Sequence, residues 1–363
     1  MKVLVLATDV FGGTGGIARY TRDFVAAVAS YPATIDVVVI PRVIAREPEP
    51  LPDRVTYLTA PAGSKSRFVS TVLREAARRP RFDWIVCAHV NLLSIAHAAA
   101  ALCGAKVFLL TYGIEVWDSR SRLAKLLMER TDAVASISEF TLNKMRQWSP
   151  LPADATFLLP NAIDLSSYTP GAPSADIGAK WGLDGRRVLL TLGRMDAREQ
   201  AKGFDEVLEV LPRLLEEYPQ LVYMIVGDGS DRSRLEKKSR DLGIDRSVVF
   251  TGYVEESEKL DYYRAADLFL MPSRLEGFGY VFLEALATGL PVIASKLDGS
   301  REAVRDGAWG ILVDPSNPEE LASAIKSALT KPYVPPRTEL EYFSRGNFEK
   351  RVHAALDSVS GVS

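Results

Sequence analysis

The chain has 363 residues, which is long for one hydrophobic core, so we expect two domains. Its 47% apolar and 25% charged residues are typical of a globular protein, and a net charge of −2 argues against bulk binding to nucleic acid. The charge is unevenly divided, with 19 Lys and Arg against 15 Asp and Glu in residues 1–165, and 25 against 31 in the rest. This division indicates that the N-terminal part faces something anionic.

The cysteines and the apolar runs indicate in which cellular compartment the protein works. Cys87 and Cys103 form no CxxC motif and cannot define a disulfide framework, which favours a reducing compartment. The first apolar run, residues 3–7, is too short for the core of a signal peptide, and no stretch approaches the roughly 20 apolar residues that span a bilayer. We therefore expect a cytoplasmic protein.

Short apolar runs that are typical of buried strands alternate with helical patterns along the chain. In the first half the predicted strands are 2–7, 36–40, 84–88, 106–111, 133–137 and 156–159, and the predicted helices are 17–29, 67–79, 92–102 and 140–148. In the second half the strands are 187–192, 221–226, 247–251, 267–271, 291–295 and 311–313, and the helices are 204–217, 231–242, 257–266, 279–288 and 318–329. This alternation predicts an α/β protein with two parallel sheets, each covered on both faces. The two series predict two Rossmann-like domains, joined near the Ser-, Pro- and Gly-rich stretch 165–179.

The most informative segment runs from Glu276 to Glu284. Glu276 lies among glycines after a predicted strand, and Glu284 lies in an apolar stretch, where a carboxylate is costly to bury without a partner. In open α/β sheets ligands bind outside the carboxyl ends of the strands, and a helix N-terminus there suits a phosphate. Taken alone, such a pair is more often a loop residue followed by a surface helix residue.

Three other loops follow predicted strands. The glycines at 12, 13, 15 and 16 do not fit the G-x-G-x-x-G dinucleotide pattern, and they favour a flexible loop for an acceptor or a phosphate. Arg194 and Lys202 lie between a strand and a helix, where a guanidinium and an ammonium can grip a diphosphate together. An ordinary solvated basic loop is the alternative. The turn at Gly227 and Asp228 would let a ligand pass close to the backbone, but it is a weak signal alone.

In this order, and over essentially the whole chain, these motifs resemble glycosyltransferase family 4. The matching segments are 12–16, 159–164, 193–194 with 202–203, 226–229, 250–254 and 276–284. The resemblance implies the GT-B fold, in which two Rossmann-like domains face each other across a cleft. Residues 1–165 would form the acceptor-side domain, joined by a C-terminal helix in 341–363 that crosses back to it, and residues 166–340 would bind the nucleotide sugar.

The resemblance also implies roles for single residues. Lys202 and Arg194 would hold the donor's diphosphate and Glu276 would contact the transferred sugar, and these three form the catalytic set. The other implied donor contacts are the backbone of Phe278 and Gly279, the carboxylate of Glu284 at the ribose, Tyr253 and Val254 near the base, and the turn at Gly227 and Asp228. Gly15 and Gly16 would line the acceptor side. Enzymes of this fold generally need no metal, so we expect neither a metal nor a cofactor.

One residue departs from the family pattern. Many members have a His before Gly in the loop after the strand equivalent to 106–111, and here Tyr112 occupies that position. A phenol can donate one hydrogen bond, but it is not cationic at neutral pH. His89, after the preceding strand, is a second candidate for the acceptor side, although a lone His is more often structural.

The resemblance implies a retaining glycosyltransferase that moves a hexose from a UDP- or GDP-sugar to a glycan or lipid-linked acceptor, in polysaccharide or glycolipid biosynthesis. One alternative is a nucleotide-sugar 2-epimerase of the same architecture. That enzyme would need more acids and imidazoles around the sugar, and this chain has only three His. The other alternative is a non-catalytic protein that binds sugar nucleotides.

Residues 64–81 carry six basic side chains and one acid. Arg67, Arg74, Arg78 and Arg81 would share one helical face if the helix persists that far. Such a face predicts a peripheral contact with the anionic, cytoplasmic side of a membrane, which would bring the enzyme to a lipid-linked acceptor. The alternative is an amphipathic helix packed on the sheet, with its basic face in water.

Overall fold

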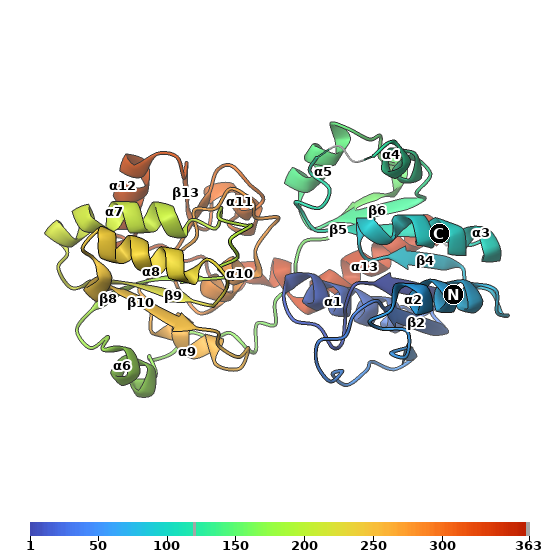
Figure 1. Cartoon of the computed structure of the whole chain (residues 1–363), viewed down its shortest axis with the longest axis horizontal. Coiled ribbons are helices and arrows are strands. Elements are labelled where there is room, and N and C mark those ends of the chain that lie inside the picture. Colours follow the sequence, from blue (N-terminus) through green and yellow to red (C-terminus); the bar gives the residue numbers. More distant parts are fainter. Residues whose placement is uncertain (119–120, 361–363) are drawn as a thin grey trace. The chain divides into compact units, whose positions relative to one another are not determined.

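The computed structural model describes residues 1–118 and 121–360. The chain divides into two compact units, each built around one sheet (Figure 1). The N-terminal unit comprises Met1–Ala162 and the segment that starts at Arg345, and the C-terminal unit comprises Ile163–Ser344. We expected the divisions three residues later and four residues earlier, at 165/166 and 340/341.

The sheet of the N-terminal unit has seven parallel strands in the order β3-β2-β1-β4-β5-β6-β7. Their bounds are β1 Lys2–Ala7, β2 Asp36–Pro41, β3 Val55–Tyr57, β4 Trp84–Cys87, β5 Lys106–Thr111, β6 Ala133–Ser136 and β7 Thr156–Leu158. All but β3 were predicted within a residue or so. The sequence gives no signal for β3 because its three residues are partly or fully exposed and form no apolar run.

Helices cover both faces of this sheet. They are α1 Gly16–Ser30, α2 Lys65–Ala76, α3 Leu93–Cys103, α4 Arg122–Glu129, α5 Glu139–Arg146 and α13 Arg345–Ser360. One core joins α2 to α5 with alternate strand residues such as Leu4, Leu6 and Ile85. On the opposite face α1 lies beside α13, as Figure 1 shows in blue and red, with the rings of Tyr20 and Phe348 5.4 Å apart. The last helix thus packs on the N-terminal unit, as the resemblance implied.

Helix α2 ends earlier than the sequence suggested. It stops at Ala76, before Pro80, which cannot continue a helix and disfavours helical backbone in the residue before it. Arg78 and Arg81 therefore lie beyond the helix, and the expectation that four arginines share one helical face is wrong. Helix α4 was not predicted at all.

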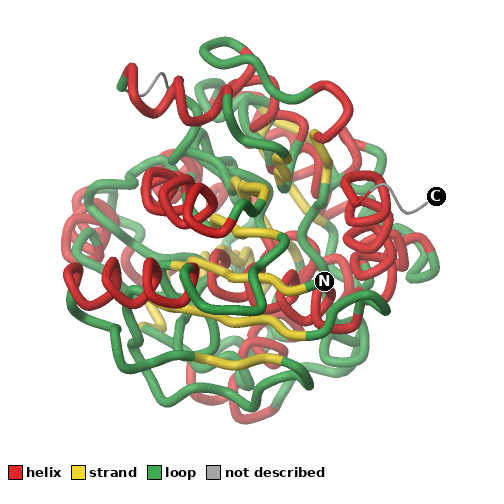
Figure 2. Tube along the Cα trace, turned by 90° about the vertical axis from the view of Figure 1, so that its right-hand side faces the viewer, coloured by secondary structure: helices red, strands yellow, loops and turns green. Residues whose placement is uncertain are grey.

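The sheet of the C-terminal unit has six parallel strands in the order β10-β9-β8-β11-β12-β13. Their bounds are β8 Arg187–Leu192, β9 Leu221–Val226, β10 Val248–Gly252, β11 Leu268–Leu270, β12 Val292–Ser295 and β13 Ile311–Val313. The helices are α6 Ala175–Trp181, α7 Phe204–Glu217, α8 Arg232–Asp241, α9 Lys259–Arg264, α10 Tyr280–Ala287, α11 Ser300–Ala303 and α12 Pro318–Thr330. Figure 2, viewed from the side of the N-terminal unit, shows the strands of the first sheet side by side in yellow with red helices outside them. Helix α6 begins inside the stretch that we read as a linker.

Each face of this second sheet is also covered. Helices α7, α8 and α12 pack on strand residues such as Leu189 and Ile225. On the other face the ring of Phe282, from α10, meets that of Phe269 at 5.4 Å. The predicted fold class, two parallel Rossmann-like units, is confirmed. Among the described residues, no helix combines the length and the apolar character that crossing a bilayer requires.

Candidate active site

An ion pair lies at the carboxyl edge of the second sheet. Lys202 comes from the loop between β8 and α7, and Glu276 from the loop between β11 and α10. The Lys202 ammonium donates to Glu276 Oε2 at 2.7 Å, and the two side chains are 20% and 16% exposed. Strands β8 and β11 are neighbours in the sheet, so their loops emerge side by side and bring together two residues 74 positions apart. The pair that the sequence assigned to diphosphate and sugar therefore forms one local cluster.

The charge state of Lys202 follows from its surroundings. Burial alone would lower its pKa, but the carboxylates of Glu276, Glu199 and Asp298 outweigh that effect and raise the pKa above the usual lysine value. The ammonium is therefore a fixed positive charge throughout the neutral range. A fixed cation at this edge suits a phosphate ligand.

Asp298, after β12, binds the loop that carries Glu276. Its carboxylate is fully buried and accepts the backbone N–H of Glu276 at 2.9 Å. The sequence alone assigned Asp298 no role in the site. Strands β11 and β12 are neighbours in the sheet, so the loops that follow them emerge side by side.

Helix α10 begins directly after this loop. Gly279, its N-cap residue, has φ +90°, a conformation that favours glycine, and no side chain among the described residues caps the helix there. Phe278 is buried against Phe343, with ring centroids 5.5 Å apart, and so anchors the start of the helix. The first backbone N–H groups of α10 thus follow Glu276 closely in the chain. An anion would be favoured at these N–H groups.

Glu284 lies inside the unit and not on its surface. The residue is fully buried, and Tyr263 donates its hydroxyl to Glu284 Oε2 at 2.8 Å, with the Lys259 ammonium 4.0 Å away. Burial, followed by the charge of Glu284, raises the pKa of Tyr263 well above its usual value, so the phenol remains a donor. The surface alternative is therefore wrong. Sequence reasoning missed Tyr263 as the partner, although a buried tyrosine hydroxyl usually has one.

Arg194 lies near the cluster in the chain, but its side chain points elsewhere. Its guanidinium donates to Glu199 at 2.7 Å, and the side chain is 61% exposed. It does not contact Glu276 in the part of the chain that the structure describes. Lys202 and Glu276 are brought together, whereas Arg194 belongs to a charged surface loop with Asp196 and Arg198.

The turn after β9 is packed against the loop that carries Arg194. Gly227 has φ +137°, and a Cβ there would fall 2.1 Å from the carbonyl oxygen of Gly193, so only glycine fits. The carbonyl of Asp228 accepts the N–H of Met195 at 3.0 Å, while its side chain is exposed. The ring of Tyr253 is exposed after β10, and Val254 is buried.

The residues that the resemblance assigned to the acceptor side lie at the carboxyl edge of the first sheet. Gly15, with φ +92°, starts α1 beside Gly16, and the space around its Cα is open. The buried hydroxyl of Tyr112 donates to the carbonyl of Ala88 at 3.1 Å, and burial raises its pKa. His89 Nδ1 accepts the N–H of Asn91 at 3.2 Å, which caps a short 3-10 turn, so its imidazole has a structural role.

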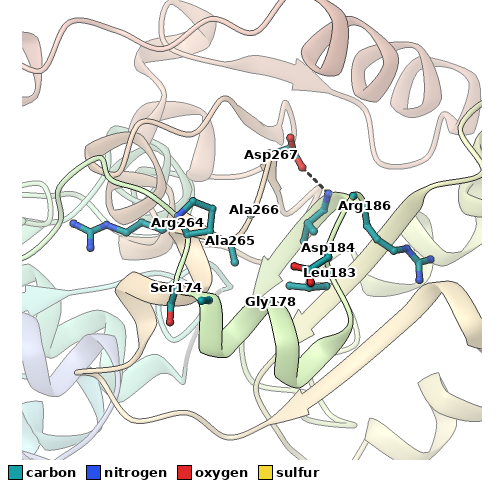
Figure 3. A pocket seen from close by; sticks show the side chains of 13 residues that line it. Ser174, Gly178, Leu183, Asp184, Arg186, Arg264, Ala265, Ala266 and Asp267 are labelled. Atoms are coloured by element: carbon teal, nitrogen blue, oxygen red, sulfur yellow. Dashed lines mark hydrogen bonds between the residues drawn. The ribbon is translucent and has the colours of Figure 1, made fainter.

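A separate cavity lies at the opposite edge of the second sheet (Figure 3). It has a volume of about 390 Å³ and is lined by residues that include Ser174, Arg186 and Arg264. Asp267, just before β11, accepts the N–H of Val188, at the start of β8, at 2.7 Å. The cavity therefore faces the amino ends of the strands, away from Lys202 and Glu276. Within the described ranges, no group of three or more His, Cys, Asp and Glu could hold a metal ion.

Comparison with known proteins identifies the family. The model for "Glycosyltransferase Family 4" matches residues 14–167, and that for "Glycosyl transferases group 1" matches residues 175–346. A GDP-mannose-dependent monoacylated alpha-(1-6)-phosphatidylinositol monomannoside mannosyltransferase of Corynebacterium glutamicum is 30% identical over 355 residues, which cover 91% of this chain and 89% of the relative. The chain belongs to glycosyltransferase family 4. It is therefore an enzyme that transfers a sugar from a nucleotide sugar to an acceptor.

Two further comparisons bear on length and fold. A GDP-mannose-dependent alpha-(1-6)-phosphatidylinositol monomannoside mannosyltransferase of Mycolicibacterium smegmatis is 32% identical over 234 residues, 61% of this chain, and the match spans 60% of that relative's length. The crystal structure of Anabaena HepE in complex with UDP-glucose has a TM-score of 0.80 at 21% identity, covering 99% of this chain and 100% of HepE. The two-unit architecture is thus the GT-B fold of family 4.

Proposed function

We propose that this enzyme transfers mannose from GDP-mannose, with retention of configuration, to a lipid-linked acceptor. The observation that carries the proposal is the Lys202–Glu276 pair, which joins a fixed cation to a carboxylate at the start of α10. A diphosphate that leaves a sugar develops negative charge, and an ammonium beside a helix N-terminus stabilises that charge without reorganisation. An ammonium has three N–H donors, so Lys202 can hold a phosphate oxygen while it keeps Glu276 oriented.

The remaining site residues take supporting roles in this proposal. Glu276 would accept a hydroxyl of the transferred sugar, and Glu284, held by Tyr263, would accept a ribose hydroxyl through its remaining capacity. Positioning and charge stabilisation would do most of the chemical work, and no strong base is required. This agrees with a phenol at Tyr112, where the family has an imidazole.

The choice of guanine rests on two observations. The relatives compared above are named for GDP-mannose. In addition, Glu255 and Glu256 follow Val254 directly, in the loop after β10, and both are exposed. Guanine presents an N–H and an amino group on one edge, which a carboxylate can accept together, whereas uracil presents a single N–H.

The choice of a lipid-linked acceptor is supported by the outer helix layer, the solvent side of α2, α3 and α4. Leu123 and Leu126 on α4 are 56% and 42% exposed, and Val69 and Leu102 are also exposed. The exposed basic side chains of the same layer are Lys65, Arg67, Arg74, Arg122, Lys125 and Arg130. Apolar and basic side chains together suit an anionic leaflet. The proposed contact is therefore broader than α2, and it places the protein at the cytoplasmic face of a membrane.

A turnover assay tests the function. The enzyme is incubated with GDP-mannose or UDP-glucose, with and without a phosphatidylinositol mannoside in detergent micelles, and the products are analysed by NMR. We expect an α-mannosylated lipid from GDP-mannose only when acceptor is present. A β-linked product would overturn retention, isomerised sugar nucleotide without acceptor would favour the epimerase, and binding without any turnover would favour the non-catalytic alternative.

A further inference from the structure

We propose that Asp298 is a positioning residue for Glu276, and that the pair Asp298–Gly299 sets the direction in which the Glu276 carboxylate points. The inference rests on the proposed function for what Glu276 contacts. It concerns the neighbouring loop, which lies after β12 and has no assigned part in the reaction.

The hydrogen bonds of Asp298 fill both of its carboxylate oxygens. Oδ2 accepts from the hydroxyl of Ser273 at 2.5 Å and from the N–H of Glu276 at 2.9 Å. Oδ1 accepts from the hydroxyl of Ser300 at 2.6 Å and from its N–H at 3.0 Å. Each oxygen therefore faces one backbone N–H, which cannot reverse its direction. A carboxylate satisfies both, whereas an amide would turn its own N–H groups against one of them.

A second contact holds the next peptide group, on the other side of the Glu276 Cα. The N–H of Gly299 donates to the carbonyl oxygen of Glu276 at 2.8 Å. A Cβ on Gly299 would fall 2.0 Å from the carbonyl oxygen of Gly277, so the two loops touch backbone to backbone. Two consecutive residues, Asp298 and Gly299, thus bind the N–H and the C=O of Glu276. The backbone of Glu276 is held from both sides.

The charge of Asp298 also acts on the site. Burial raises its pKa, its hydrogen bonds oppose that rise, and the negative charge of Glu276 adds to it. The carboxylate in turn helps to keep Lys202 protonated. A fully buried carboxylate is costly, and this one is placed where it fixes a reacting residue and supports its cation. Misplacing a reacting group by about 1 Å can cost about 100-fold in rate, so the direction of Glu276 matters.

The matched pair of variants is Asp298→Asn and Asp314→Asn. Asp314, after β13, accepts the N–H of Ser316 at 2.8 Å and its hydroxyl at 2.5 Å, a pattern like that of Asp298 with Ser300, but it does not hold Glu276. We expect Asp298→Asn to lower kcat about 10- to 100-fold while the Kd for GDP changes less than about threefold. Asp314→Asn should leave both unchanged. In the Glu276→Gln background, Asp298→Asn should have little further effect.

Hydrogen exchange gives a readout that needs no turnover. The amide of Glu276 should exchange at least about tenfold faster in Asp298→Asn than in the wild type or Asp314→Asn. If Asp298→Asn fails to fold, Ser273→Ala removes one bond to Oδ2 and should accelerate the same amide. Unchanged exchange at Glu276, or a kcat effect fully additive with Glu276→Gln, overturns the inference. A wild-type enzyme without turnover would instead count against the proposed function, while the exchange result would still decide the role of Asp298.

Discussion

The carboxyl edges of the two sheets differ in their electrostatics. In the C-terminal unit, Lys202, Glu276 and Asp298 form an interlocked set of charges at that edge. In the N-terminal unit, charged side chains at the corresponding edge bind loop backbone: Glu115 accepts the N–H of Tyr112 at 2.6 Å, and Arg22 donates to the carbonyl of Gly13 at 3.0 Å. Two similar parallel sheets thus use their edge charges differently, with Lys202 and Glu276 in an ion pair at one edge and Glu115 bound to loop backbone at the other. This difference supports the proposal that the C-terminal unit carries the charge-dependent chemistry.

The N-terminal unit also carries positive charge on its outer helix layer. Six exposed basic side chains lie on the outer helix layer, which also exposes Leu123 and Leu126. These basic side chains contribute to the excess of Lys and Arg in residues 1–165. The contrast can be tested by substitutions on each side, from the largest expected effect to the smallest.

The two glutamates should separate turnover from binding. Glu276→Gln should lower kcat by about 100-fold or more, with a smaller change in nucleotide affinity, because its partner is the sugar that moves in the transition state. Glu284→Gln should mainly weaken donor binding, since a ribose contact exists before the reaction. Steady-state kinetics and calorimetry measure both effects. Full turnover by Glu276→Gln would remove it from the catalytic set.

The fixed cation should dominate the binding of the diphosphate. Lys202→Ala should weaken GDP binding about 10- to 100-fold, the value of a charge-assisted contact. Arg194→Ala tests the second residue predicted to bind the diphosphate. The control is Arg198→Ala, which removes a side chain that is 87% exposed in the same loop and should leave GDP affinity unchanged. Because the pKa of Lys202 is raised above the usual lysine value, titration of its ammonium should not weaken GDP binding anywhere in the neutral range. Equal affinity in Lys202→Ala and the control would disprove the assignment.

The outer helix layer should bind anionic vesicles weakly. Each basic residue contributes about 1 kcal/mol near an anionic leaflet, so binding should be reversible and should fade between low and physiological salt. Leu123→Gln with Leu126→Gln should reduce co-sedimentation about fivefold or more, and Arg67→Ser with Arg74→Ser should do the same. Ile35→Gln removes an apolar side chain that is 72% exposed outside this layer, and it serves as the control. If the wild type ignores anionic vesicles at low salt, a soluble acceptor becomes the better hypothesis.

The carboxyl edge of the first sheet should tolerate the loss of the Tyr112 hydroxyl. Tyr112→Phe removes the hydrogen bond to Ala88 and should cost about 1 kcal/mol of stability, but turnover should change less than about threefold. Burial raises the pKa of Tyr112, so the group stays neutral over the working range and the pH–rate profiles of variant and wild type should superimpose. A large loss of kcat with a shifted profile would show that this edge takes part in proton transfer.

The sequence could predict the strands and the chemistry of single residues better than their contacts. Continuous apolar runs located every strand except β3, whereas α4, a helix of eight residues, was missed although it is strongly amphipathic. The cost of burying Glu284 was evident from its neighbours, but Tyr263, 21 residues away, becomes its partner only through tertiary packing. The hydrogen bond from the Glu276 N–H to Asp298 likewise depends on β11 and β12 being neighbours in the sheet.

Hydrogen exchange of the whole enzyme with and without saturating GDP tests the central contrast most directly. The account predicts slower exchange in peptides that contain Lys202 and residues 276–284 of the C-terminal unit, and unchanged exchange around His89 and Tyr112. Protection confined to the loops of the N-terminal unit, or to the cavity around Ser174 and Arg186, would contradict it.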